Sequence, residues 1–422
     1  MKTKDQILNM IEEEDVEFIR LQFTDVWGNL KNIAITPDQI KRAMDNEFSI
    51  EGGALFDGLV SVDTDLYLVP DPDTFVILPW RPQQGKVAKM ICDLAYEDGK
   101  LFEMSPRSVL KKVVKEAEAK GFTFAVNTEC EFFLFHTDEN GNPTTLTHEN
   151  AGYLDVGPVD FGENARRDMV LTLEELGFKV ESSHHERASA QHEIDFMQGE
   201  SVDAADAVIT FRFAVRSIAK RFGLCASFMP KPKADAAGSG MHTKFAMYRN
   251  GVNLFDSAKN GEISDTAKYF IGGIMSHAPA LCAITNPIVN SYKRILSGFE
   301  APGNIDWAVN GKNALIKLQR CLGENKVELR FPDSSANPYL EIAVCIAAGL
   351  DGIEKKISPD SIPKTRKLPE SLESAIKHME KDELMKEALG EELTKLYIDV
   401  KKAEWKEYMI QVSEWEINRY LV

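Results

Sequence analysis

Pairs of acidic residues two positions apart are the chemically informative feature of this sequence. Glu129 and Glu131 flank Cys130 in the segment NTECEFFLF. If this segment is a strand, both carboxylates leave one face and Cys130 takes the other. Adjacent carboxylates repel each other, so without a cation between them they cost stability or raise a pKa. The pair therefore indicates a metal site, although a solvated strand face explains this pair, taken alone, equally well.

Three further segments, QHEIDF, GSGMHTKF and NKVELRFPD, add polar side chains on predicted strands or in the bends beside them. The candidate metal ligands are Glu129, Glu131, Glu186, Glu193, His242 and Glu328. Hard cations prefer oxygen ligands, Mn²⁺ tolerates an imidazole, and the absence of cysteine disfavours zinc. The set therefore suits Mg²⁺ or Mn²⁺. Such sites commonly hold nucleotide phosphates, which makes phosphoryl transfer the leading reaction class.

Basic residues near these strands suit the same chemistry, because they could neutralise a transferring phosphoryl group or clamp a carboxylate. They are Lys293, Arg294, Lys312, Lys317 and Arg330. The segment SGFEAPGN has glycines and a proline around Glu300, which is typical of a mobile loop. Glu300 is a candidate base only if this loop closes over the site.

The elements that must position these residues can be read from hydrophobic periodicity. Residues 1–100 predict a β-rich unit with a turn at Gly28 and Asn29, and a helix is expected from Pro106 to Gly121. Strands and helices then alternate, and the strands are amphipathic. This pattern predicts an α+β domain with a curved antiparallel sheet. After residue 351 the sequence becomes helical and charged.

Composition excludes several classes of protein. The 422 residues contain 49 Lys+Arg and 66 Asp+Glu, a net charge of −17, so a phosphate backbone or an anionic membrane would be repelled. No apolar run reaches the roughly 18 residues of a membrane helix, and the first residues lack the apolar stretch of a signal peptide. We expect a cytoplasmic protein that binds neither nucleic acid nor membranes, with its six scattered cysteines reduced.

An ordered series of motifs runs through the chain. They are LQFTDVWGNLKN, FDG, TECEFFLF, SSHHERASAQHEIDF, FMPKP, GSGMH, NSYKR, GFEAP and VELRFPDSSANPYL. Through them the sequence resembles prokaryotic type I glutamine synthetases over nearly its whole length. The resemblance implies a β-grasp N-terminal domain at 1–100 and a catalytic domain with a helical tail at 101–422. It also implies a homododecamer of two stacked hexameric rings, with each active site between neighbouring subunits.

The resemblance also implies a reaction, in which ATP phosphorylates the γ-carboxylate of glutamate and ammonia displaces the phosphate. It assigns one metal ion to Glu131, Glu186 and Glu193, and the other to Glu129, His242 and Glu328. The implied catalytic residues are Asp57 from the neighbouring subunit, Glu300, Arg294 and Lys312. The implied substrate residues are Tyr153 for ammonium, Gly238, Arg294 and Arg330 for glutamate, and Lys244, Lys312 and Lys317 for ATP.

The chain departs from the family pattern around the substrates. Smaller, apolar or less geometrically selective groups replace polar ones at Leu59, Val60, Ala237, Ala246, Lys312 and Lys317. Three functions therefore stay open: glutamine synthesis from ammonia, ligation of an alkylamine or polyamine, and a weakly active or inactive homologue with a regulatory role. The six retained candidate ligands favour activity, because such crowded polar groups are costly without a cation.

Overall fold

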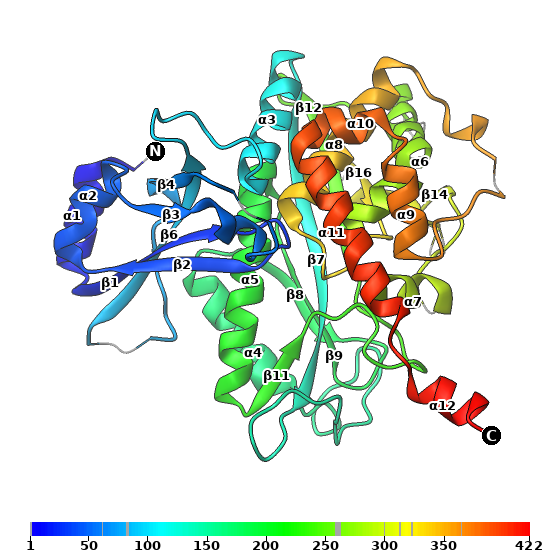
Figure 1. The fold of residues 1–422 in the computed structure, drawn as a ribbon, viewed down its shortest axis with the longest axis horizontal. Coiled ribbons are helices and arrows are strands. Elements are labelled where there is room, and N and C mark those ends of the chain that lie inside the picture. The colour runs from blue at the N-terminus through cyan, green and yellow to red at the C-terminus, as the bar shows by residue number, and fades with distance from the viewer. Residues whose placement is uncertain are drawn as a thin grey trace.

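A first, six-stranded sheet forms the N-terminal part of the chain (Figure 1). The computed structural model describes residues 2–60, 62–81, 84–257, 263–298, 300–311, 314–321, 324–363 and 365–422. The strands of this sheet are β1 (Val16–Thr24), β2 (Leu30–Ile35), β3 (Ser49–Glu51), β4 (Asp65–Pro70), β5 (Val76–Ile77) and β6 (Lys86–Ala95). Their order is β2-β1-β6-β4-β3, with β5 beside β6 and a parallel β1–β6 pair.

Local sequence explains how this unit begins. Helix α1 (Lys4–Glu13) starts at a capping box, in which the side chains of Thr3 and Gln6 satisfy each other's backbone N–H groups. The β1–β2 hairpin turns at Gly28, whose φ of +86° favours glycine, as predicted. Helix α2 (Ile40–Met44) follows this hairpin.

A second, ten-stranded sheet carries most of the predicted ligands. Its strands are β7 (Thr123–His136), β8 (Val180–His185), β9 (Gln191–Phe196), β10 (Gly199–Glu200), β11 (Leu224–Ser227), β12 (Met241–Arg249), β13 (Val252–Asn253), β14 (Trp307–Val309), β15 (Ile316–Cys321) and β16 (Glu324–Leu329). The main order is β14-β15-β16-β12-β7-β9-β8. The predicted α+β class is confirmed, but the curved sheet is mixed, because β14 and β15 run parallel.

Helices cover this sheet and form the C-terminal part. They are α3 (Pro106–Ala119), α4 (Glu163–Glu175), α5 (Ser201–Arg221), α6 (Asp265–Thr285), α7 (Val289–Ser297), α8 (Pro338–Glu354), α9 (Leu372–Met379), α10 (Glu383–Leu389), α11 (Glu391–Met409) and α12 (Glu414–Tyr420). Helix α12 projects away from the rest of the chain in Figure 1. Within the described residues, no helix has the length and apolar character needed to cross a membrane.

Two polar junctions connect these layers. The buried guanidinium of Arg107 on α3 lies 2.8 Å from carboxylate oxygens of Asp71, Asp93 and Asp206, and so joins the first sheet to α5. One apolar core also runs through both parts of the chain. The N-terminal unit is therefore packed firmly onto the rest of the chain.

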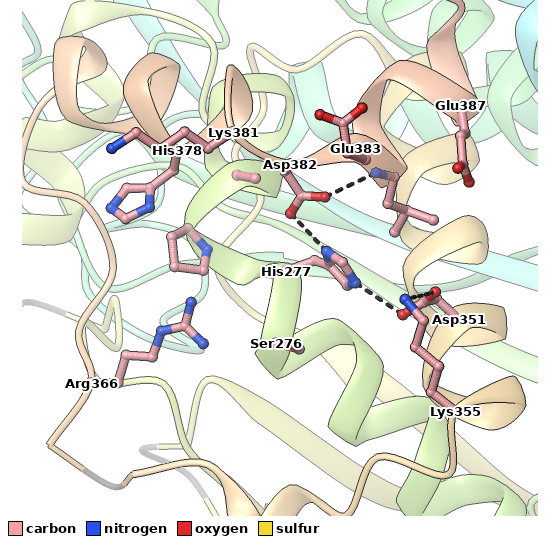
Figure 2. A pocket seen from close by; sticks show the side chains of 13 residues that line it. Ser276, His277, Asp351, Lys355, Arg366, His378, Lys381, Asp382, Glu383 and Glu387 are labelled. Carbon is pink, nitrogen blue, oxygen red and sulfur yellow. Dashed lines mark hydrogen bonds and ion pairs between the residues drawn. The ribbon is translucent and has the colours of Figure 1, made fainter.

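The second junction is a group of ion pairs around His277, which lines a pocket of about 400 Å³ among the C-terminal helices (Figure 2). In it, Nδ1 of His277 on α6 lies 2.7 Å from Asp382, and Nε2 lies 3.2 Å from Asp351 on α8. Both carboxylates outweigh the effect of burial and raise the pKa of His277. His277 therefore connects α6 and α8 to the start of α10 through two carboxylates that favour its protonated form.

Candidate active site

Strand β7 presents the acidic pair as its alternation predicts. Glu129 and Glu131 are partly exposed on one face, whereas Cys130 and Phe132 are buried on the other. The buried side chains pack into an apolar cluster with α4 and α5. Burial of one face therefore fixes which way the two carboxylates point.

Strand register brings the other candidates beside this pair. On one side of β7, Glu193 of β9 lies opposite Glu131. On the other side, His242 of β12 lies opposite Glu129, and Glu328 of β16 lies opposite Lys244 of β12. Because directly paired residues in a sheet lie close together, the register gathers groups that are up to about 200 positions apart in the sequence.

A cavity of about 340 Å³ opens over this face of the sheet. It is lined by most of the residues predicted from the sequence: Glu129, Glu131, Tyr153, Glu186, Glu193, Gly238, His242, Arg294, Glu300, Lys317, Glu328 and Arg330. Lys312 lies outside the described residues. Asp57 and Lys244 do not line this cavity within one chain.

Glu129, His242 and Glu328 form a compact group, with one potential ligand atom from each within 4.8 Å of the others. Nδ1 of His242 lies 3.2 Å from Glu129 Oε2 and 3.7 Å from Glu328 Oε1. Burial alone would raise the pKa of Glu129, but His242 and Lys244 outweigh it and lower that pKa to about 2. Glu129 is therefore a carboxylate at any physiological pH.

The second set, Glu131, Glu186 and Glu193, lies beside the first. Glu131 accepts hydrogen bonds from Gln191 Nε2 at 3.0 Å and from the backbone N–H of Gly240 at 2.8 Å. Burial and then the charge of Glu131 raise the pKa of Glu186 to about 8. Burial and neighbouring acids likewise raise the pKa of Glu193. This crowding of carboxylates is what a divalent cation would relieve, so the donor set fits one.

The sequence prediction gave no role to three residues that also line this cavity, which are His184, Asp195 and Arg187. His184 and Asp195 form a potential ligand group with Glu193. His184 lies opposite Glu193 in the β8–β9 register, and its Nε2 is 3.9 Å from Glu193 Oε1. The sequence shows that Asp195 shares a strand face with Glu193, because the two residues are two positions apart. Only the strand register shows that His184 faces the same cavity.

A buried cluster beneath the β8–β9 turn positions Glu186. His185 Nε2 lies 2.8 Å from Glu149 Oε1, and that carboxylate also accepts from the backbone N–H of Ala190. Arg166 Nη1 lies 2.7 Å from Asp160 Oδ2 within the same cluster. Because the guanidinium already supplies positive charge there, this cluster is structural and holds the turn in place.

Arg294 and Gly238 shape the side of the cavity predicted to bind glutamate. Arg294 is 2% exposed, and its guanidinium donates to the carbonyl oxygens of Phe331 at 3.0 Å and Arg330 at 3.2 Å. A Cβ on Gly238 would lie 2.1 Å from the carbonyl oxygen of Pro230, so no other residue fits. Arg294 thus supports the segment after β16.

Two of the lysines predicted on the nucleotide side, Lys244 and Lys317, pair with the candidate ligands. Lys317 Nζ on β15 lies 3.0 Å from Glu328 Oε2. Lys244 is buried, and its ammonium group bonds to Glu129. Burial lowers the pKa of Lys244, but Glu129 outweighs this effect and leaves the pKa raised. Lys244 therefore remains cationic beside Glu129.

The mouth of the cavity is formed by Tyr153, Arg187 and Glu300. Arg187 Nε lies 3.3 Å from Glu300 Oε1, and its guanidinium lies 4.7 Å from the centroid of the Tyr153 ring. A second cavity of about 820 Å³ shares Arg187, Glu300 and Arg330 with the first, and Ala237 also lines it. The two cavities therefore adjoin each other at these three residues.

Asp57 follows a 3₁₀ turn (Gly52–Phe56) of the N-terminal domain, and its φ is 54°. Its carboxylate lies 2.6 Å from Lys31 Nζ. Leu59, two residues later, is 63% exposed. This segment therefore presents an acid and an apolar side chain at the surface.

The second sheet gathers carboxylates, a histidine and cationic side chains around one cavity, and a smaller N-terminal domain is joined to it. This combination of fold and site is typical of a metal-dependent enzyme. Residues 15–96 match the family "Glutamine synthetase, beta-Grasp domain", and residues 103–420 match "Glutamine synthetase, catalytic domain". The chain belongs to the glutamine synthetase family. Enzymes of this family are ligases that need ATP and a divalent metal ion.

Relatives and solved structures are similar over the full length. The chain is 47% identical to "Glutamine synthetase" of Clostridium saccharobutylicum, covering 99% of this chain and 98% of that protein. It is 42% identical to "Glutamine synthetase" of Thermus thermophilus, covering 99% of both. A solved structure described as "GmaS/ADP complex-Conformation 1" has a TM-score of 0.89 at 30% identity, covering 98% of this chain and 99% of that one.

Proposed function

We propose that the cavity lined by the six candidate ligands is the place where this ligase forms glutamine. The protein phosphorylates the γ-carboxylate of glutamate with ATP and condenses the product with ammonia. Full-length identity of 42–47% to glutamine synthetases supports this reaction. The observation that carries the assignment to this site is that all six candidate ligands line one cavity.

We assign two divalent metal sites to the two ligand sets. Glu131, Glu186 and Glu193 would hold one ion, and Glu129, His242 and Glu328 would hold the other. Carboxylate-rich sets with one imidazole suit Mg²⁺ or Mn²⁺. Bound ions would neutralise charge on the phosphate oxygens of ATP. Lys244, which bonds to Glu129, would add positive charge on the nucleotide side, and so would Lys317. We assign the same role to Lys312 from the sequence alone.

Residues of the glutamate side orient the acceptor. Arg330, Arg294 and the backbone at Gly238 would hold the amino acid, with its γ-carboxylate toward the phosphates of ATP. An oxygen of that carboxylate takes the γ-phosphoryl group, and ADP leaves. The nitrogen of ammonia then attacks the acyl carbon, the C–O bond to phosphate breaks, and inorganic phosphate departs. The acyl phosphate turns a poor leaving group into a good one.

The nitrogen substrate would bind at the mouth of the cavity. Tyr153 and Glu300 offer a ring face and a carboxylate there, which favour ammonium. We propose that Asp57 of a neighbouring subunit removes its proton, because Asp57 is exposed and lines no part of the cavity in its own chain. A dodecamer of two hexameric rings would provide this arrangement. Separated monomers should then be inactive even if they stay folded, and an active monomer would contradict it.

A second candidate is ligation of an alkylamine or polyamine. The exposed Leu59, next to Asp57, favours it because an apolar side chain suits a carbon chain better than ammonium. A catalytically inactive homologue is the third candidate, and the retained ligand set argues against it.

Phosphate release from ATP separates these functions. The assay contains glutamate and Mg²⁺ or Mn²⁺, with ammonia, methylamine or putrescine as the nucleophile. Phosphate release with ammonia supports glutamine synthesis, and release only with an alkylamine supports the second candidate. No release with any nucleophile contradicts both ligase functions and supports the inactive homologue. Glu300→Ala should abolish ligation but leave ADP binding largely intact. Glu174→Ala, at an exposed acid on α4, is the matched control.

A further inference from the structure

Arg187 stands between the two cavities of the site. It follows Glu186 in the turn between β8 and β9, and it lines both the ligand cavity and the larger adjoining cavity. The backbone of this turn is held by a 3.0 Å hydrogen bond from the N–H of Gln191 to the carbonyl oxygen of Ala188. A fixed backbone therefore delivers a long cationic side chain to the mouth of the site.

The contacts of Arg187 are those of a cation in a recognition site. Its guanidinium lies 4.7 Å from the centre of the Tyr153 ring, and its Nε lies 3.3 Å from Glu300 Oε1. An aromatic face together with a carboxylate is the combination that recognises cationic ligands. In this chain the Tyr153 ring and the Glu300 carboxylate already contact a cation of the protein itself, the Arg187 guanidinium.

We propose that Arg187 is a specificity-determining residue that occupies, as a built-in cation, the position between Tyr153 and Glu300, and so weakens binding of ammonium and other cationic amines. This inference rests on the proposed function, in which these two groups receive the nucleophile. The side chains of Arg187 and Glu300 are 50% and 51% exposed, so water screens their ion pair and it is weak. Arg187 therefore competes with a cationic substrate and does not block the site.

The proposal can be tested by comparing a charged nucleophile with an uncharged one. Steady-state phosphate release is measured at saturating ATP and glutamate for the wild type, Arg187→Gln and Arg187→Lys. Ammonium is one nucleophile, and hydroxylamine, which is uncharged at neutral pH, is the other. Arg187→Gln should lower KM for ammonium by about threefold to tenfold, the range of an exposed ion pair with a cation–π contact. Arg187→Lys should stay near the wild type, and KM for hydroxylamine should not change.

Arg42→Gln is the matched control. Arg42 makes the same two kinds of contact in the N-terminal domain, because its Nε lies 2.7 Å from Glu47 and its guanidinium lies 5.4 Å from the Phe48 ring centre. This variant should leave KM for ammonium unchanged. An unchanged or increased KM in Arg187→Gln would overturn the inference. Equal decreases for ammonium and hydroxylamine would also overturn it, since they indicate a steric effect.

Failure of the proposed function can be distinguished from failure of the Arg187 proposal. A wild type that releases no phosphate with ammonium or hydroxylamine refutes the proposed function, and the role of Arg187 is then tested without turnover. Ligand-observed NMR with methylammonium should show binding to Arg187→Gln that is about threefold or more tighter than to the wild type. Equal affinity of methylammonium for both proteins would refute the proposal that Arg187 competes with cationic amines.

Discussion

Replacing Glu341 with glutamine should remove a pH-dependent loss of stability from beneath the active site. Glu341 lies in the first turn of α8 and is fully buried. Its Oε1 is 3.8 Å from the Sγ of Cys345, and its Oε2 has no hydrogen-bond partner within the described part of the chain. Burial raises the pKa of Glu341 to about 8, although Thr243 of β12 opposes the shift. Glutamine has nearly the shape of the protonated acid.

The size of the effect follows from that pKa. An unfolded chain ionises glutamate near pH 4.3, and each pKa unit between the folded and unfolded states corresponds to about 1.4 kcal/mol. The protonated Glu341 therefore contributes its full stability below about pH 4.3. This contribution is lost as pH rises toward 8, by about 5 kcal/mol in total. The glutamine variant carries no such loss, so it should gain stability relative to the wild type across this range.

The assay is thermal unfolding of both proteins at equal concentration between pH 5 and 9. The melting temperature of Glu341→Gln should be close to that of the wild type at pH 5 and higher at pH 9. Glu354→Gln changes an exposed acid on the same helix, and it should give a difference that does not vary with pH. Parallel curves for Glu341→Gln and the wild type would refute the reasoning, because Glu341 would then already be ionised in the folded protein.

Three other predictions follow from the contacts described above. His277→Gln should destabilise the protein by about 2 kcal/mol at pH 6 and by less at pH 9, because the raised pKa of His277 gives stability that is lost as pH rises through it; thermal unfolding at both pH values checks this. Arg107→Met should cost about 3 to 5 kcal/mol in the same assay by leaving buried carboxylates unpaired. His242→Ala should weaken Mn²⁺ binding at least about tenfold in calorimetric titration, and equal affinity would exclude His242 as a ligand.

Local alternation predicted the orientation of the acidic pair. Glu129 and Glu131 leave one face of β7 because Cys130 and Phe132 must enter the apolar core on the other. A side chain's face along a strand depends only on its neighbours in sequence, so it can be read without the fold. The Gly28 turn and the helix beginning at Pro106 were predictable for the same reason.

Non-local pairing decided the rest of the site. No local pattern indicates that Lys244 bonds to Glu129, or that His184 lies opposite Glu193, because strand register depends on how separate segments pack. The parallel β14–β15 pair escaped prediction for the same reason, since amphipathic strands can pair in either direction.

The sequence by itself determined the family resemblance, the candidate ligand set and the acids' shared strand face. Tertiary structure alone decided that Arg187 lies between Tyr153 and Glu300, because these three residues come from three separate segments of the chain and meet only when those segments pack together. The sequence specifies which charges are present. Folding sets the distances between them, and those distances determine which charges are already paired when a substrate arrives.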